Sequence, residues 1–145
     1  MNKVTYENYL DVNGEMTYSN VGISMMPLLK QGRDLFTVRK KGAERCRKYD
    51  VVLYRRPPSN YVLHRVIQVR KDDYVILGDN CINKEYGIKD SDIIGVMTSY
   101  IHNGKKRNID HLGYRIYSWI WVNFASVRIL LQKVKNRMRR VKHET

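Results

Sequence analysis

The sequence predicts a mainly β protein, with an antiparallel sheet or barrel followed by a C-terminal amphipathic α-helix. Short runs rich in β-branched and aromatic residues recur at roughly ten-residue spacing with polar turns between them, as in antiparallel sheets. In the last part of the chain, apolar residues instead recur at spacings of three and four, the period of a helix. We therefore expect a β-rich domain over residues 1–111 and a basic helix over residues 112–145.

Five strands are expected in the first part, and they are separated by turn signals such as Pro-Pro-Ser-Asn and Asn-Gly. A short helix is expected at residues 25–32, because Pro27 suits the first turn of a helix and Gly32 suits its end. The expected strands are residues 35–38, 50–55, 61–69, 74–78 and 92–101.

Composition excludes several classes of protein. The chain has 145 residues, of which 43% are hydrophobic, and this argues against a disordered polyelectrolyte. No uncharged apolar run reaches about 18 residues, and the first 20 residues lack the apolar middle of a secretory signal. Cys46 and Cys81 are too few for a disulfide scaffold and have no metal-ligand spacing with any histidine, so we expect no metal and no cofactor.

The formal net charge of +13 first suggests a nucleic-acid-binding protein, but its distribution weakens that interpretation. Residues 112–145 hold eight Lys or Arg and one acid, so this segment carries +7 and residues 1–111 carry +6. Residues 116–127 (IYSWIWVNFASV) are uncharged and contain both tryptophans, whereas residues 133–142 (KVKNRMRRVK) are strongly basic. Such a helix is typical of a membrane interface, and basic residues near anionic lipid add affinity. Docking of the helix on its own domain is the second interpretation, and nucleic-acid binding is the least favoured.

Three patches contain residues that could carry chemistry. Ser24 precedes the expected short helix, where free backbone N–H groups could hold an oxyanion, although a plain N-cap serine would look the same. His64 lies in a strand pattern, and a neutral imidazole is a natural general base for a serine hydroxyl. Asp79 follows Gly78 in a Gly-Asp-Asn turn, and Glu85 comes six residues later.

Taken together and in order, these patches resemble the signal peptidase I superfamily of serine proteases, which includes the peptidase domains of SOS-type repressors. Residues 22–27 (GISMMP) resemble its nucleophile box, G-x-S-M-x-P, and residues 50–54 (DVVLY) resemble its D-[IV]-V strand. Residues 63–67 (LHRVI) are similar to its K-R-V-I box, and residues 78–80 match its G-D-N box. The likeness covers about residues 18–100. It implies a coiled antiparallel sheet or partly open barrel.

The resemblance also implies a mechanism. Most bacterial members have lysine where this chain has His64, so the chain resembles the Ser-His branch found in endoplasmic-reticulum-type signal peptidases. A lysine base must lose about 3 units of pKa, whereas a histidine near 6.5 needs almost no shift. Members with histidine use an acidic third residue, and Glu85 stands where that branch has an aspartate. Asp79 is the other candidate, and it could equally be a structural turn residue.

The expected function is therefore a serine endopeptidase that cleaves a leader, signal or other precursor peptide with Ser24 as nucleophile and His64 as base. Signal peptidases usually carry an N-terminal membrane helix, whereas the 21 residues that precede Gly22 here contain no long apolar run. We accordingly expect a cytoplasmic enzyme held on a membrane surface by its C-terminal helix. The alternative is a non-enzymatic basic module that binds a membrane surface or a nucleic acid. A self-processing regulator is disfavoured, because the chain has no Ala-Gly or Ala-x-Ala site.

Overall fold

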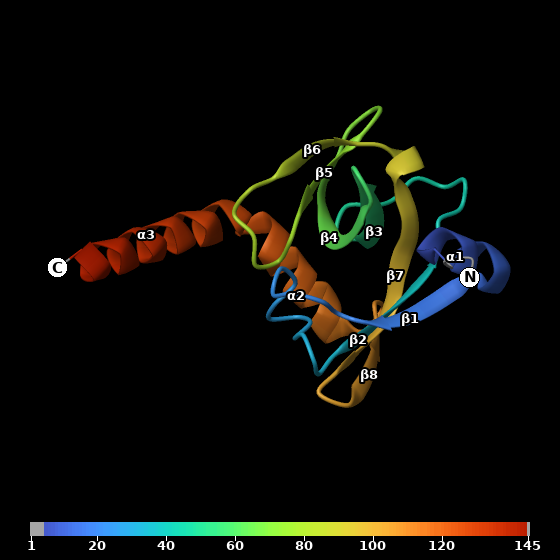
Figure 1. Ribbon diagram of the computed structural model, residues 1–145, viewed down its shortest axis with the longest axis horizontal. Coiled ribbons are helices and arrows are strands. Elements are labelled where there is room, and N and C mark those ends of the chain that lie inside the picture. Colours follow the sequence, from blue (N-terminus) through green and yellow to red (C-terminus); the bar gives the residue numbers. More distant parts are fainter. Residues whose placement is uncertain (1–4, 145) are drawn as a thin grey trace.

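The computed structural model describes residues 5–144 and contains an eight-stranded antiparallel sheet that curls without closing (Figure 1). Helix α1 precedes the sheet, and helices α2 and α3 follow it. The elements in chain order are α1 (Tyr6–Asn13), β1 (Glu15–Ser19), β2 (Leu35–Lys40), β3 (Val51–Arg56), β4 (Asn60–Val69), β5 (Tyr74–Leu77), β6 (Glu85–Ile88), a 3-10 turn η1 (Asp90–Asp92), β7 (Ile93–His102), β8 (Lys105–Asn108), α2 (Leu112–Asn123) and α3 (Ala125–Glu144).

The strands run in the order β1-β2-β7-β3-β4-β5-β6, and β8 pairs with β7 as a hairpin. Strand β7 therefore joins the N-terminal pair β1–β2 to the meander β3–β6. Register shifts occur between Thr37 and Val38 and between Leu53 and Tyr54, and such bulges bend and twist a strand. All five expected strands are confirmed, with each end displaced by at most two residues.

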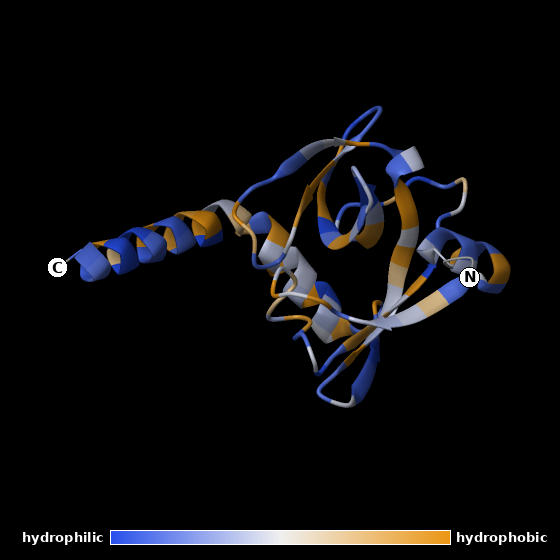
Figure 2. Ribbon diagram, viewed as in Figure 1, coloured by the Kyte–Doolittle hydropathy of each residue, from blue (hydrophilic) through white to orange (hydrophobic). Residues whose placement is uncertain are grey.

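The interior of the curled sheet is apolar. One group of buried side chains lies between α1, the segment after β1 and the strands β2, β3 and β7, and a second lies against β3, β4 and β5. In Figure 2 the hydrophobic colour follows β7 and the strands facing it, whereas the turns at the edges are hydrophilic.

The prediction of a short helix at residues 25–32 is wrong. Residues 21–34 form successive turns, and the Met26–Pro27 peptide bond is cis. Pro27 has no N–H to donate, and core packing holds the segment instead of a helical ladder of hydrogen bonds. Met25 and Leu29 are both fully buried in the core.

The C-terminal helical segment and several other elements also differ from the prediction. The single helix expected over residues 112–145 is two helices that are separated at Phe124, and Thr145 lies outside the described residues. The Asn123 side chain donates to the Trp119 carbonyl and to the Tyr49 hydroxyl, competing with the helical ladder at that point. No helix within residues 5–144 is both long and apolar enough to cross a bilayer. Helix α1 and strands β1, β6 and β8 were not anticipated.

Helix α2 packs against the sheet, whereas α3 projects from the body (Figure 1). Tyr114 of α2 is buried with the core residues, and Ser118 is 2% exposed. The domain boundary expected after residue 111 would therefore assign α2 to the C-terminal segment, although α2 packs against the β-rich domain.

Candidate active site

Ser24 lies in the turn segment that leads away from β1, and it is half-buried. Gly22 has a φ of 81°, a left-handed conformation that favours glycine, and its N–H donates to the Gln31 side chain at 2.8 Å. The buried Asn20 donates to the carbonyls of Gly22 and Leu29. These bonds fix the loop that carries Ser24. The helix dipole expected behind Ser24 is absent, because the following residues are not helical.

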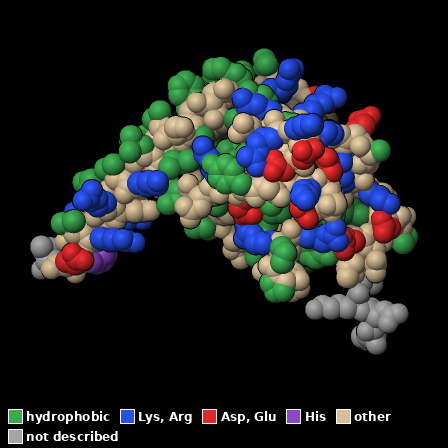
Figure 3. Space-filling view, turned by 90° about the horizontal axis from the view of Figure 1, so that it is seen from above, with side chains coloured by type: hydrophobic (Ala, Val, Ile, Leu, Met, Phe, Trp, Pro, Cys, Tyr) green, Lys and Arg blue, Asp and Glu red, His purple; other side chains and the backbone are tan. Residues whose placement is uncertain are grey.

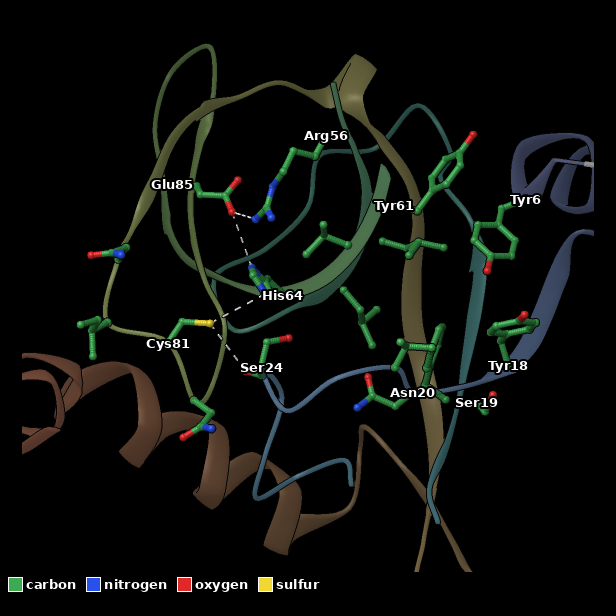
Figure 4. Close-up of a pocket in the computed structure, with 18 of the residues that line it drawn as sticks. Tyr6, Tyr18, Ser19, Asn20, Ser24, Arg56, Tyr61, His64, Cys81 and Glu85 are labelled. Atoms are coloured by element: carbon green, nitrogen blue, oxygen red, sulfur yellow. Dashed lines mark hydrogen bonds and ion pairs between the residues drawn. The ribbon is translucent and has the colours of Figure 1, made fainter. Parts of the chain in front are cut away.

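His64 projects from the middle of β4 into the same region, and its side chain is almost fully buried. It is paired across the sheet with Val52 of β3, so two central strands fix its position. Its Nε2 atom lies 4.0 Å from Cys81 Sγ, which lies 4.0 Å from the Ser24 carbonyl oxygen. Figure 4 shows Ser24 and His64 in the same part of the cleft, each joined to Cys81 by a dashed line. The structure thus brings together the two residues expected to form the dyad.

The turn after β5 closes this arrangement from the other side. The Asn80 N–H donates to the Ser24 carbonyl at 2.8 Å, and the Asn80 side chain donates to the Ile23 carbonyl at 3.1 Å. A β-carbon on Gly78 would lie 2.8 Å from the Ser24 carbonyl and 2.9 Å from His64 Nε2. Gly78 therefore permits the nucleophile loop and the histidine to approach the same turn.

The other ring nitrogen of His64, Nδ1, lies near polar groups. His64 Nδ1 lies 3.2 Å from the Tyr54 hydroxyl and 3.9 Å from Glu85 Oε1. Arg56 forms an ion pair with Glu85 and also donates to the Tyr54 hydroxyl at 3.3 Å. Burial raises the pKa of Tyr54 to about 12, so its hydroxyl stays protonated at neutral pH.

The imidazole is held in its neutral form. Burial, and secondarily the positive charge of Arg56, lowers the pKa of His64 to about 4. At neutral pH the ring therefore carries one proton, and its other nitrogen can act as a base. Burial also raises the pKa of the neighbouring Cys81 thiol, which keeps that group uncharged.

Asp79 has a different environment from Glu85. Its carboxylate is 2% exposed and accepts two hydrogen bonds from the Arg65 guanidinium, at 2.8 and 2.9 Å. The hydroxyl of Tyr117 donates to the same carboxylate, and the indole of Trp121 donates to the Asp79 carbonyl. These partners tie the Gly-Asp-Asn turn to α2. Among the two candidate acids, Glu85 lies beside the His64 ring, and Asp79 is engaged by the fold.

Ser24 and His64 open into a cleft of about 710 Å³. Aromatic and aliphatic side chains from α1, β1 and β2 line one end, and residues of the turn after β5 and of α3 line the other. Tyr54, Arg56 and Cys81 were not anticipated as neighbours of the histidine. Tyr54 belongs to a strand pattern that gives no sign of a polar role, and only the cross-strand register reveals it.

Within residues 5–144, no group of three or more His, Cys, Asp or Glu side chains is arranged to hold a metal ion. Comparisons of the chain with protein-family models, curated proteins and solved structures gave no significant match.

Proposed function

We propose that this protein is a serine endopeptidase, similar to signal peptidase I, that hydrolyses a peptide bond in a leader or other precursor peptide. One observation supports it above the others. Ser24 and His64 lie 40 residues apart in the sequence, yet their backbone and ring atoms approach the same turn, at Gly78, within a single cleft. Independent structural roles for a loop serine and a strand histidine would not require this convergence.

In the proposed reaction, His64 Nε2 accepts the Ser24 hydroxyl proton as the oxygen attacks the substrate carbonyl. A proton on Nδ1, donated to the Tyr54 oxygen, leaves the Nε2 lone pair free for this step. The imidazolium then protonates the leaving amine, and the acyl-enzyme forms. Water attacks the ester as His64 accepts its proton, and His64 then returns that proton to the Ser24 oxygen as the ester C–O bond breaks and the carboxylic acid product leaves. The charge of Asp79 favours the transient imidazolium, and Glu85, which is paired with Arg56, is the carboxylate nearest to Nδ1, at 3.9 Å.

The cleft also offers a place for an extended peptide. Strand β1 is an edge of the sheet, and Ser19 and Asn20 at its end line the cleft that contains Ser24. An unpaired edge can accept a substrate strand through backbone hydrogen bonds, and neighbouring pockets then select side chains. The resemblance stated above implies small residues before the cleaved bond.

Labelling with a fluorophosphonate probe, which reacts with activated serines, tests the proposal. We expect labelling of the full chain and loss of labelling in Ser24→Ala and in His64→Ala. Ser59→Ala is the matched control, because Ser59 lies in the β3–β4 turn and outside the Ser24 cleft. Labelling that persists in Ser24→Ala would contradict the dyad, and absence of labelling from the folded wild type would favour a non-enzymatic binding module.

Cleavage of a peptide library gives the second readout. The wild type should release fragments with a preference for small residues on the N-terminal side of the cut, and both dyad variants should release none. Equal cleavage by wild type and variants would assign the activity to a contaminant.

A further inference from the structure

Helix α3 has an apolar side that is largely exposed to solvent. Five of its large hydrophobic side chains are between 48% and 64% exposed, although apolar side chains normally gain by burial. In Figure 3 such side chains follow the projecting helix with lysines and arginines beside them. These residues are Val127, Leu130, Leu131, Val134 and Met138.

Their arrangement around the helix is regular. With 3.6 residues per turn, the five side chains fall within an arc of about 100°. Gln132 and Asn136, which line the cleft, lie on the opposite side of the helix. The apolar arc therefore faces away from the Ser24 cleft, and the two α3 residues that line that cleft are polar. Leu130, at the margin of the arc, borders a separate hollow that it shares with Ile82 and Tyr86.

The apolar surface continues onto α2. Ile120 and Phe124 at the end of α2 are 43% and 52% exposed. They share a groove of about 360 Å³ with Val127 and Leu131 of α3. The two helices thus present one connected apolar surface rather than isolated exposed residues.

Positive charge borders this surface on both sides. Residues 125–144 contain seven Lys or Arg and a single acid, Glu144. Lys133 and Arg137 lie on one flank of the apolar arc, and Lys135 lies on the other. An occupant of this surface must accept apolar side chains in its interior and must carry negative charge at its boundary.

We infer that the outer side of α3, together with the end of α2, docks on an anionic lipid surface. A bilayer with acidic head groups offers a hydrocarbon layer bordered by negative charge, the combination that the helix requires. A second copy of α3 would fit the apolar arc but would bring two rows of cations together. A nucleic acid would satisfy the cations but would leave the apolar arc in water. The interaction is independent of the proposed peptidase activity.

Co-sedimentation with vesicles tests the inference. The full chain should bind vesicles of phosphatidylcholine with 30% phosphatidylglycerol at least tenfold more strongly than vesicles of phosphatidylcholine alone. Val134→Asp, at the centre of the arc, should weaken that binding at least tenfold. Lys133→Gln combined with Lys135→Gln should weaken it by about fivefold for each charge removed.

The matched control is Val12→Asp, which makes the same exchange at an exposed helical position on α1, and its binding should stay within twofold of the wild type. Equal binding to neutral and anionic vesicles, or equal loss in both valine variants, would overturn the inference. Sedimentation as a dimer without lipid that Val134→Asp abolishes would assign the surface to a second copy. Retention on duplex DNA that Val134→Asp leaves intact, without vesicle binding, would assign it to nucleic acid.

Discussion

Asp79 is buried against Arg65, which is 1% exposed and donates to both carboxylate oxygens. Ser118 of α2 accepts a further hydrogen bond from the same guanidinium, at 2.8 Å. A buried ion pair of this kind adds little net stability over an apolar pair, but loss of one partner leaves an uncompensated charge.

Asp79→Asn should therefore destabilise the fold. Removal of the carboxylate leaves the Arg65 charge unpaired, and we expect a loss of about 3 kcal/mol in the free energy of unfolding, measured in urea. Glu85→Gln should alter that free energy by less than about 1 kcal/mol, because Glu85 is partly exposed and its ion pair lies near solvent. A larger loss for Glu85→Gln than for Asp79→Asn would contradict this division of roles.

The Arg56 guanidinium tunes the base. Burial is the larger cause of the low pKa of His64, and Arg56 is the next. With a folded pKa of about 4, labelling of Ser24 should stay constant from neutral pH down to about pH 5 and fall below it. Arg56→Gln should move this fall to higher pH, whereas Arg55→Gln, which loses an ion pair with Glu7, should not. An unchanged pH profile in Arg56→Gln would exclude the proposed influence.

The low pKa of His64 also determines how the stability of the protein changes with pH. The unfolded His64 has a pKa near 6.5 and binds a proton more readily than the folded one, so the protein should lose stability as the pH falls from about 6.5 to about 4. Urea unfolding of wild type and His64→Gln at pH 7 and pH 5 checks this. The variant should lose less stability between the two pH values.

At this scale, the sequence predicts the residue types at the site but not the neighbours that decide their roles. Ser24 and His64 are recognisable by the order of their motifs. The sequence does not show which of Asp79 and Glu85 lies beside the His64 ring. The ion pair of Asp79 with Arg65 distinguishes the two acids, and Arg65 follows His64 directly in the sequence. Its side chain points to the other face of β4, as alternation along a strand requires.

Among the secondary-structure elements, the turn after β5 organises the site. It binds the Ser24 loop through Asn80, and α2 holds it from behind through Tyr117 and Trp121. The approach of the loop and the histidine is so close that no side chain fits at Gly78.

Gly78→Ala should consequently abolish labelling of Ser24 while the protein remains folded. The added β-carbon would lie 2.6 Å from Cys81 Sγ and 2.8 Å from the Ser24 carbonyl, so the loop must shift. Gly42→Ala is the control, because its β-carbon would meet no atom within 4 Å. Circular dichroism confirms folding of both variants, and wild-type labelling by Gly78→Ala would contradict the packing described here.

Strands were predictable because each presents an apolar run bounded by polar turns, such as residues 74–77. The segment after β1 was not, because the pattern of Pro27 and Gly32 fits a helix as well as a series of turns. Helix α1 left a signal that could have been used: Thr5 caps its N-terminus by accepting from the Asn8 N–H, and Gly14 ends it at a φ of 77°.

For the whole molecule, the C-terminal segment has two distinct roles. Helix α2 completes the core and contacts Arg65 and Asp79, whereas α3 projects and leaves its apolar arc exposed. The charge excess of the segment is concentrated in α3. The contacts of α3 with the domain include the buried Ala125 and the hydrogen bond from Arg128 to the Cys81 carbonyl, so the tail can be shortened beyond Arg128 while these are kept.

Truncation after Arg128 should therefore leave the domain folded, with a melting temperature close to that of the full chain, because most side chains beyond Arg128 are exposed. Truncation after Asp110 should lower the melting temperature strongly, because it uncovers Tyr100 and leaves Arg65 without Ser118 and the Tyr114 ring. The first truncation should also lose binding to anionic vesicles and keep labelling at Ser24, which separates the lipid surface from the peptidase site. Unfolding of both truncated proteins would show that α3 is part of the folded domain, and equal stability of both would show that α2 is not.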